Sequence, residues 1–137
     1  TLSQILLILK ITLMKKLVKI ILISFSLIIL IIAILIFRPV PIVSESQTIS
    51  ESGIVTEIYS NKGNDIIFIL ENTKRRFYIN RGLEIGLELS NLKEKLIGKS
   101  IIVKYPKYWT PLDWNNSVRH ISKVEFDDEI VFNELKK

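Results

Sequence analysis

The hydrophobic pattern of the chain is densest between Leu17 and Phe37. This stretch reads LVKIILISFSLIILIIAILIF, and after Lys19 its remaining 18 residues carry no charge. A helix over those residues is about 27 Å long, which is close to the apolar thickness of a bilayer. Because a helix pairs its backbone polar groups within itself, residues 17–37 are predicted to cross a membrane as a single helix.

Positive charges lie mainly before this stretch. Lys15, Lys16 and Lys19 stand at its start, whereas only Arg38 follows it closely. The positive-inside rule therefore places the N-terminus in the cytoplasm and the C-terminal domain outside an inner or cytoplasmic membrane, on its periplasmic or extracellular side. The stretch is longer than a signal-peptide core and ends in bulky residues, so a retained signal anchor is favoured over a cleaved signal peptide.

Residues 1–16 are expected to form a short cytoplasmic segment. Met14 is the only methionine and is followed by two lysines, which is typical of a bacterial export start. We therefore expect Met14 to be the true initiator and residues 1–13 to be an artefact of gene calling. The alternative is that residues 1–13 are a genuine apolar leader.

After the apolar stretch the pattern changes twice. Residues 38–50, RPVPIVSESQTIS, contain two prolines and a polar tail, which predicts an extended linker. From residue 51 onward, short runs rich in Ile, Val, Phe and Tyr alternate with turn residues, which predicts a mainly β domain over residues 51–137. The expected strands cover 54–59, 65–71, 75–80, 99–105 and 118–126, with a further short strand at 129–132.

One short helix is predicted between the third and fourth strands. Asn91 can cap it, Glu94 lies three residues further on, as a capping box requires, and Gly98 can end it. Its apolar positions fall on one face: Leu89, Leu92, Leu96 and Ile97.

This order of elements resembles the OB-fold. Three strands precede the helix, and Gly98 and Lys99 then lead directly into the apolar residues 101–103, as at the fourth strand of such domains. The resemblance covers residues 51–126 and concerns topology. It implies a five-stranded, partly open barrel with one helix between strands 3 and 4. It also implies a binding face over strands 2 and 3 and over the loops Ser60–Asn64 and Pro106–Ser117.

Composition limits what this domain is expected to bind. The chain carries a formal charge of +5, with 19 Lys and Arg against 14 Asp and Glu. Five of the basic residues lie at or before Arg38, the first residue of the linker. This leaves 14 basic and 14 acidic residues from position 39 onward. A neutral domain lacks the charge that dominates nucleic-acid affinity, so no nucleic acid is expected as a partner. The absence of cysteine excludes disulfides and thiol chemistry.

The most unusual soluble stretch, YPKYWTPLDWNN, contains both tryptophans of the protein. Tyr105, Tyr108, Trp109 and Trp114 are therefore our candidate ligand-binding residues, because large rigid side chains contribute contact area at little entropic cost. Two other interpretations remain open. Trp109 could fold back as a plug of the barrel, or the aromatic residues could contact the bilayer interface.

No catalytic or metal-binding motif is predicted, and no cofactor is expected. His120 is the only histidine, and its proximity in sequence to Asp113 and Ser117 does not define a nucleophile triad, which is recognised by geometry. The acidic run 127–129 lacks the alternation and the glycine of a calcium loop. The basic cluster 74–76, together with Arg81, could meet an anionic group or could simply be a charged hairpin tip.

These observations favour a non-enzymatic role. The leading hypothesis is a membrane-anchored module whose outer β domain binds a protein, peptide or glycan through the aromatic loop. The alternative is an accessory or regulatory subunit that acts on a membrane protein complex through its transmembrane helix.

Overall fold

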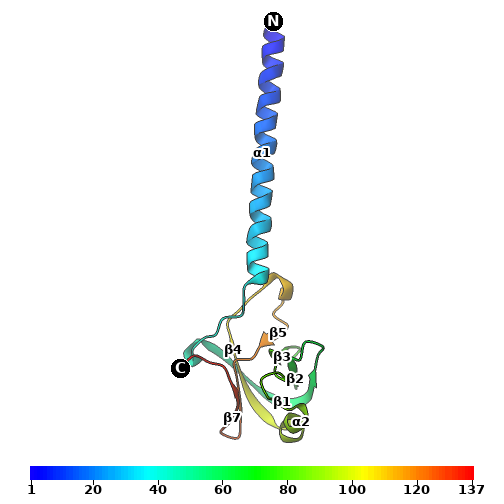
Figure 1. Cartoon of the computed structure of the whole chain (residues 1–137), viewed down its shortest axis with the longest axis vertical. Coiled ribbons are helices and arrows are strands. Elements are labelled where there is room, and N and C mark those ends of the chain that lie inside the picture. The colour runs from blue at the N-terminus through cyan, green and yellow to red at the C-terminus, as the bar shows by residue number, and fades with distance from the viewer. The chain divides into compact units, whose positions relative to one another are not determined.

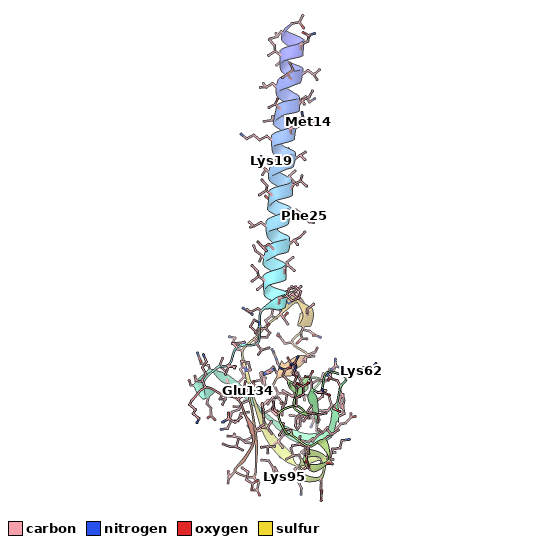
Figure 2. All side chains as sticks on the ribbon, viewed as in Figure 1. Met14, Lys19, Phe25, Lys62, Lys95 and Glu134 are labelled. Atoms are coloured by element: carbon pink, nitrogen blue, oxygen red, sulfur yellow. The ribbon has the colours of Figure 1, made fainter.

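The computed structural model describes all of residues 1–137 and divides them into two units, Thr1–Arg38 and Pro39–Lys137. The first unit is the helix α1 (Leu2–Phe37), in which no residue is buried. Its side chains project outward along its whole length, as the labelled Lys19 and Phe25 show (Figure 2). The predicted apolar helix over 17–37 is confirmed, although α1 begins earlier.

α1 is long and apolar enough to span a membrane. It has 36 residues, and its most apolar 18-residue window has a mean hydropathy of 3.4. At about 1.5 Å per residue the whole helix measures roughly 54 Å, which exceeds the bilayer core of about 30 Å.

The second unit is built on a mixed sheet (Figure 1). Its seven strands lie in the order β5-β3-β2-β1-β4-β6-β7, and all neighbours are antiparallel except β3 and β5. The strands are β1 (Thr48–Ser60), β2 (Ile66–Leu70), β3 (Arg76–Ile79), β4 (Ser100–Pro106), β5 (Val118–His120), β6 (Lys123–Phe126) and β7 (Glu129–Asn133). The other elements are α2 (Leu89–Leu96) and the 3₁₀ turns η1 (Glu45–Gln47) and η2 (Pro111–Asp113).

The expected five-stranded barrel is wrong in two respects: the sheet has seven strands, and it is not closed as a barrel. The expected fifth strand is divided into β5 and β6, because the chain changes neighbours between them. The amide of Ile121 donates to the carbonyl of Tyr78 in β3, and the amide of Ser122 donates to the carbonyl of Lys104 in β4, both at 2.8 Å. β7 then extends the sheet beyond β6.

β1 starts within the segment expected to be a linker. Its residues from Thr48 to Ile54 pair with β4, and its later part pairs with β2. The register shifts between Val55 and Glu57, where the strand passes from one neighbour to the other. One long strand thus joins the two halves of the sheet.

α2 lies between β3 and β4, as predicted, but it begins at Leu89, so Asn91 falls inside the helix. Gly98 follows it with a φ of +75°, the left-handed conformation that glycine adopts readily. Leu96 is fully buried, whereas Ile97 is 44% exposed. Ile97 leaves the apolar face because its own backbone is extended and the helix has already ended.

A single apolar core holds the second unit together. It is formed by side chains from the strands and from one face of α2. Its members are Val55, Ile58, Ile66, Phe68, Leu70, Phe77, Ile79, Leu92, Leu96, Ile101, Val103, Tyr105, Ile121 and Val124.

Candidate functional site

The aromatic loop, residues 107–117, connects β4, in the interior of the sheet, to the edge strand β5. It leaves β4 after Pro106, which lies opposite Thr48 of β1. It returns at Val118, which pairs with Arg76 of β3. Both ends of the loop are therefore fixed by strands, and η2 shapes its middle.

Asp113 holds the second half of the loop in place. Its carboxylate accepts hydrogen bonds from the amide and the hydroxyl of Ser117, both at 2.8 Å, and from the amide of Val118 at 2.9 Å. Burial by itself would raise the pKa of Asp113, but these hydrogen bonds outweigh burial and hold the pKa below its usual value. Asp113 is thus an ionised acceptor that serves the loop itself.

The two tryptophans lie together. Their ring centroids are 5.4 Å apart at an interplanar angle of 72°, and the indole N–H of Trp109 donates to the carbonyl of Trp114 at 3.3 Å. Trp109 is half-buried, whereas Trp114 is 76% exposed and its neighbour Leu112 is 73% exposed. We call Leu112 and Trp114 the loop tip.

Tyr105 lies deeper than both tryptophans, whereas Tyr108 is half-buried like Trp109. Tyr105 is only 2% exposed, and its hydroxyl donates to the Glu51 carboxylate at 3.0 Å. Burial, followed by the neighbouring Glu51, raises the pKa of the Tyr105 hydroxyl. Tyr108 is half-buried, and its carbonyl accepts from the Arg119 guanidinium at 2.9 Å. These two tyrosines support the loop from below, and the tip is the part that faces outward.

A layer of charged side chains lies beneath the loop. Arg75 pairs with Glu51 at 2.8 Å, and the Arg119 guanidinium lies 5.4 Å from the centre of the Tyr105 ring. The Nε atom of Arg119 is buried without a hydrogen-bond partner. This layer links β1, β4 and β5 with the residue that precedes β3.

An open groove of about 500 Å³ adjoins the loop. It is lined by Glu51, by residues 72–75 of the turn between β2 and β3, and by residues 115–117 of the aromatic loop. We call it the polar groove, because every residue that lines it has an amide, hydroxyl or charged side chain. The sequence analysis missed it, since its two walls are about forty residues apart in the chain; the basic cluster 74–76 was the one hint.

A second hollow of about 530 Å³ lies over the outer face of β2 and β3, the face that the OB-fold resemblance implies for binding. Tyr78 lies within it and meets the ring of His120 edge-on at 5.2 Å. Burial raises the pKa of the Tyr78 hydroxyl. The lining residues are Tyr59, Asn61, Asp65, Ile67, Arg76, Tyr78, Asn80 and Val118.

The side chain of His120 contacts a residue outside the aromatic loop. Its Nε2 atom pairs with the carboxylate of Glu134 just after β7. Asp113 and Ser117 bind each other and not His120, so the three residues that are close in sequence do not form a relay. No group of three His, Asp or Glu side chains in the chain is arranged to hold a metal ion.

A scan against protein-family models finds no match for this chain, and neither does a search of curated proteins. The interpretation of the site therefore rests on its geometry.

Proposed function

We propose that this chain is a membrane-anchored, non-catalytic binding module. In this proposal α1 is a retained anchor with its N-terminus in the cytoplasm, and the second unit faces the other side of the membrane. The aromatic loop and the polar groove then bind a protein, peptide or glycan. One observation carries the proposal: a tryptophan that is 76% exposed stands on a loop whose conformation is fixed by buried and half-buried groups.

The chemistry of the loop suits ligand binding. A large exposed aromatic ring normally lowers the solubility of a protein. When its conformation is fixed, such a ring contributes contact area to a ligand with little loss of conformational freedom. The edge-on contact with Trp109 and the bonds of Asp113 hold Trp114 ready before any ligand arrives. Preorganisation of this kind increases affinity because the cost of ordering is met during folding.

The polar groove supplies the complementary polar contacts. Asn72, Asn115 and Asn116 can both donate and accept hydrogen bonds, and Lys74 adds a positive charge at the rim. A ligand with an apolar face and several hydroxyl or amide groups would use the tryptophan and the groove together. Peptides and glycans both fit this description.

The strand connections support an OB-like origin of this module. β1 pairs with both β2 and β4, β3 pairs with β5 in parallel, and α2 lies between β3 and β4. Proteins with OB-fold topology are often binding modules. On this view the hollow over β2 and β3 is a secondary place to look for ligand contacts.

Array binding tests the proposal. The full chain, reconstituted in nanodiscs, is applied to glycan and peptide arrays, together with Trp114→Ala and the control Ile130→Ala. Ile130 is 59% exposed on β7, so the control removes an exposed apolar side chain elsewhere. We expect Trp114→Ala to lose binding that the parent and the control retain. Equal binding by all three proteins would contradict the proposal, as would no binding by the parent.

In a second candidate function, α1 is the surface that binds a partner protein. Every residue of this helix is at least partly exposed, and residues 20–37 are mostly Ile and Leu. Under this alternative the chain is an accessory subunit of a membrane complex. Replacing residues 20–37 by an unrelated apolar helix would then abolish function, whereas the binding module would keep its ligand.

A further inference from the structure

The folded domain starts nearer to the membrane helix than the sequence suggests. The carbonyl of Val43 accepts a hydrogen bond from the amide of Lys136 at 3.0 Å. Glu45 pairs with Lys104, and with Lys123 at 3.2 Å. The chain between Phe37, the last residue of α1, and Val43 is therefore only residues 38–42. Such a tether reaches about 20 Å when fully extended.

The same end of the sheet carries the tether and the aromatic loop. In the antiparallel pair of β1 and β4, Thr48 lies opposite Pro106, and Ile54 lies opposite Ser100. The tether leads through η1 into Thr48, and the aromatic loop begins directly after Pro106. We call this the loop end of the pair and the other the helix end, because α2 precedes Ser100.

The tether enters the β1–β4 pair at its loop end. The paired segment of seven residues spans about 20 Å between its two ends. Along the chain, the loop end is therefore the end of the pair that follows the membrane helix most closely, and the helix end lies a further strand length along the pair.

The loop tip has the composition of a membrane-interface contact. Leu112 and Trp114 are the most exposed large apolar side chains of the second unit, at 73% and 76%. Tryptophan favours the headgroup level, where its ring is apolar and its N–H can meet polar groups. Asp113, which lies between them in sequence, turns its carboxylate toward Ser117 and Val118, away from the tip. The exposed Lys107 at the start of the loop suits phosphate groups.

We propose that the loop tip, Leu112 and Trp114, rests in the headgroup region of the bilayer that α1 crosses. This inference rests on the proposed function in taking the aromatic loop as a contact surface, and it names the partner of the tip. The polar groove behind the tip then faces solutes at the membrane surface. A peptide or glycan bound in the polar groove would then meet Trp114 at the level of the lipid headgroups and not far out in solution.

Lipid quenching of tryptophan emission tests this inference in the full chain. The chain contains two tryptophans, both in the aromatic loop, and α1 has none. In Trp109→Phe protein, Trp114 is the sole emitter. We expect its emission to fall in vesicles of brominated phosphatidylcholine relative to vesicles of the unbrominated lipid. Equal emission in the two kinds of vesicle would overturn the inference.

Two further variants separate contact from mere proximity. In the Trp109→Phe background, Leu112→Asp places a charge on the tip, and we expect it to remove the quenching while the circular dichroism of the domain stays the same. A long flexible insert after Ile42 lowers the effective concentration of the domain at the membrane, and we expect it to weaken the quenching. Quenching that neither variant changes would contradict the contact.

The array experiment is independent of these measurements. Ligand binding without lipid quenching would overturn the bilayer contact and leave the proposed function standing. Lipid quenching without any array ligand would contradict the proposed function and support the bilayer contact.

Discussion

The two ends of the β1–β4 pair are stabilised by different kinds of interaction. At the helix end, Leu92 and Leu96 of α2 are buried in the core, and the amide of Gly98 donates to the carbonyl of Val55 at 2.8 Å. At the loop end, charges and hydrogen bonds hold the structure, and the large aromatic ring of Trp114 remains outside. Buried apolar side chains therefore stabilise the helix end. The loop end is stabilised by polar contacts, so its exposed apolar side chains remain free to bind a partner.

A cluster of four charges shows how the loop end is held. Glu45 pairs with Lys104 and Lys123, and Glu125 pairs with the same two lysines at 3.1 and 2.5 Å. The side chain of Lys123 is only 9% exposed, so its charge depends on these partners. The cluster joins η1 to β4 and β6 and thereby fixes where the tether ends.

The largest effect is expected at the helix end. Leu96→Ala removes a fully buried side chain and leaves a cavity, so we expect it to lower the free energy of unfolding by about 2–5 kcal/mol. Urea unfolding of the full chain in detergent, followed by circular dichroism, measures the change. Ile97→Ala is the matched control, because this residue is 44% exposed. Equal losses for the two variants would contradict the assignment of the helix end to apolar packing.

Removing the carboxylate that holds the aromatic loop should cost less. Asp113→Ala leaves the Ser117 and Val118 donors without their acceptor, and we expect a loss of about 1–3 kcal/mol. We also expect the circular dichroism signal of the coupled tryptophan rings to weaken, because the loop opens. Ser117→Ala, which removes one donor only, should change both quantities less. An unchanged ring signal in Asp113→Ala would show that other contacts hold the pair.

The charge cluster should make stability depend on acid pH. Hydrogen bonds from Lys104 and Lys123 lower the pKa of Glu45, and those from Lys123 and Lys104 lower the pKa of Glu125. A carboxyl whose pKa is lower in the folded than in the unfolded chain stabilises the fold above its ordinary pKa. That contribution is lost as the pH falls through the lowered value.

Glu125→Gln should therefore lower the thermal midpoint at neutral pH and flatten its decline in acid. Thermal scans at several pH values measure both effects. Glu57→Gln is the control, because Glu57 is exposed on β1 outside the cluster. The same acid dependence in Glu125→Gln and in the parent would show that the cluster contributes nothing.

Local patterns in the sequence predicted the elements that depend on local interactions. The apolar run predicted α1 from its length, and the spacing of Leu92 and Leu96 predicted the buried face of α2. Gly98 marked the end of that helix correctly. Each of these features depends on residues within a few turns of one another, so a single sequence contains the information.

Features that depend on distant neighbours could not be predicted. Residues 48–50 read as the end of a polar linker, and they become part of a strand because β4 offers them a partner. The division between β5 and β6 follows from a change of neighbour that no residue type signals. For the site, the aromatic composition of the loop made Trp114 a candidate ligand-binding residue, whereas the polar groove required residues from two separate loops.

The most direct test of the central claim is the stability of Trp114→Ala. If the aromatic loop is a contact surface, this ring contributes little beyond its edge-on contact with Trp109, and urea unfolding should show a loss of no more than about 1 kcal/mol. A loss of about 3–5 kcal/mol, as expected for a buried tryptophan, would show that the ring plugs the domain and would contradict the account.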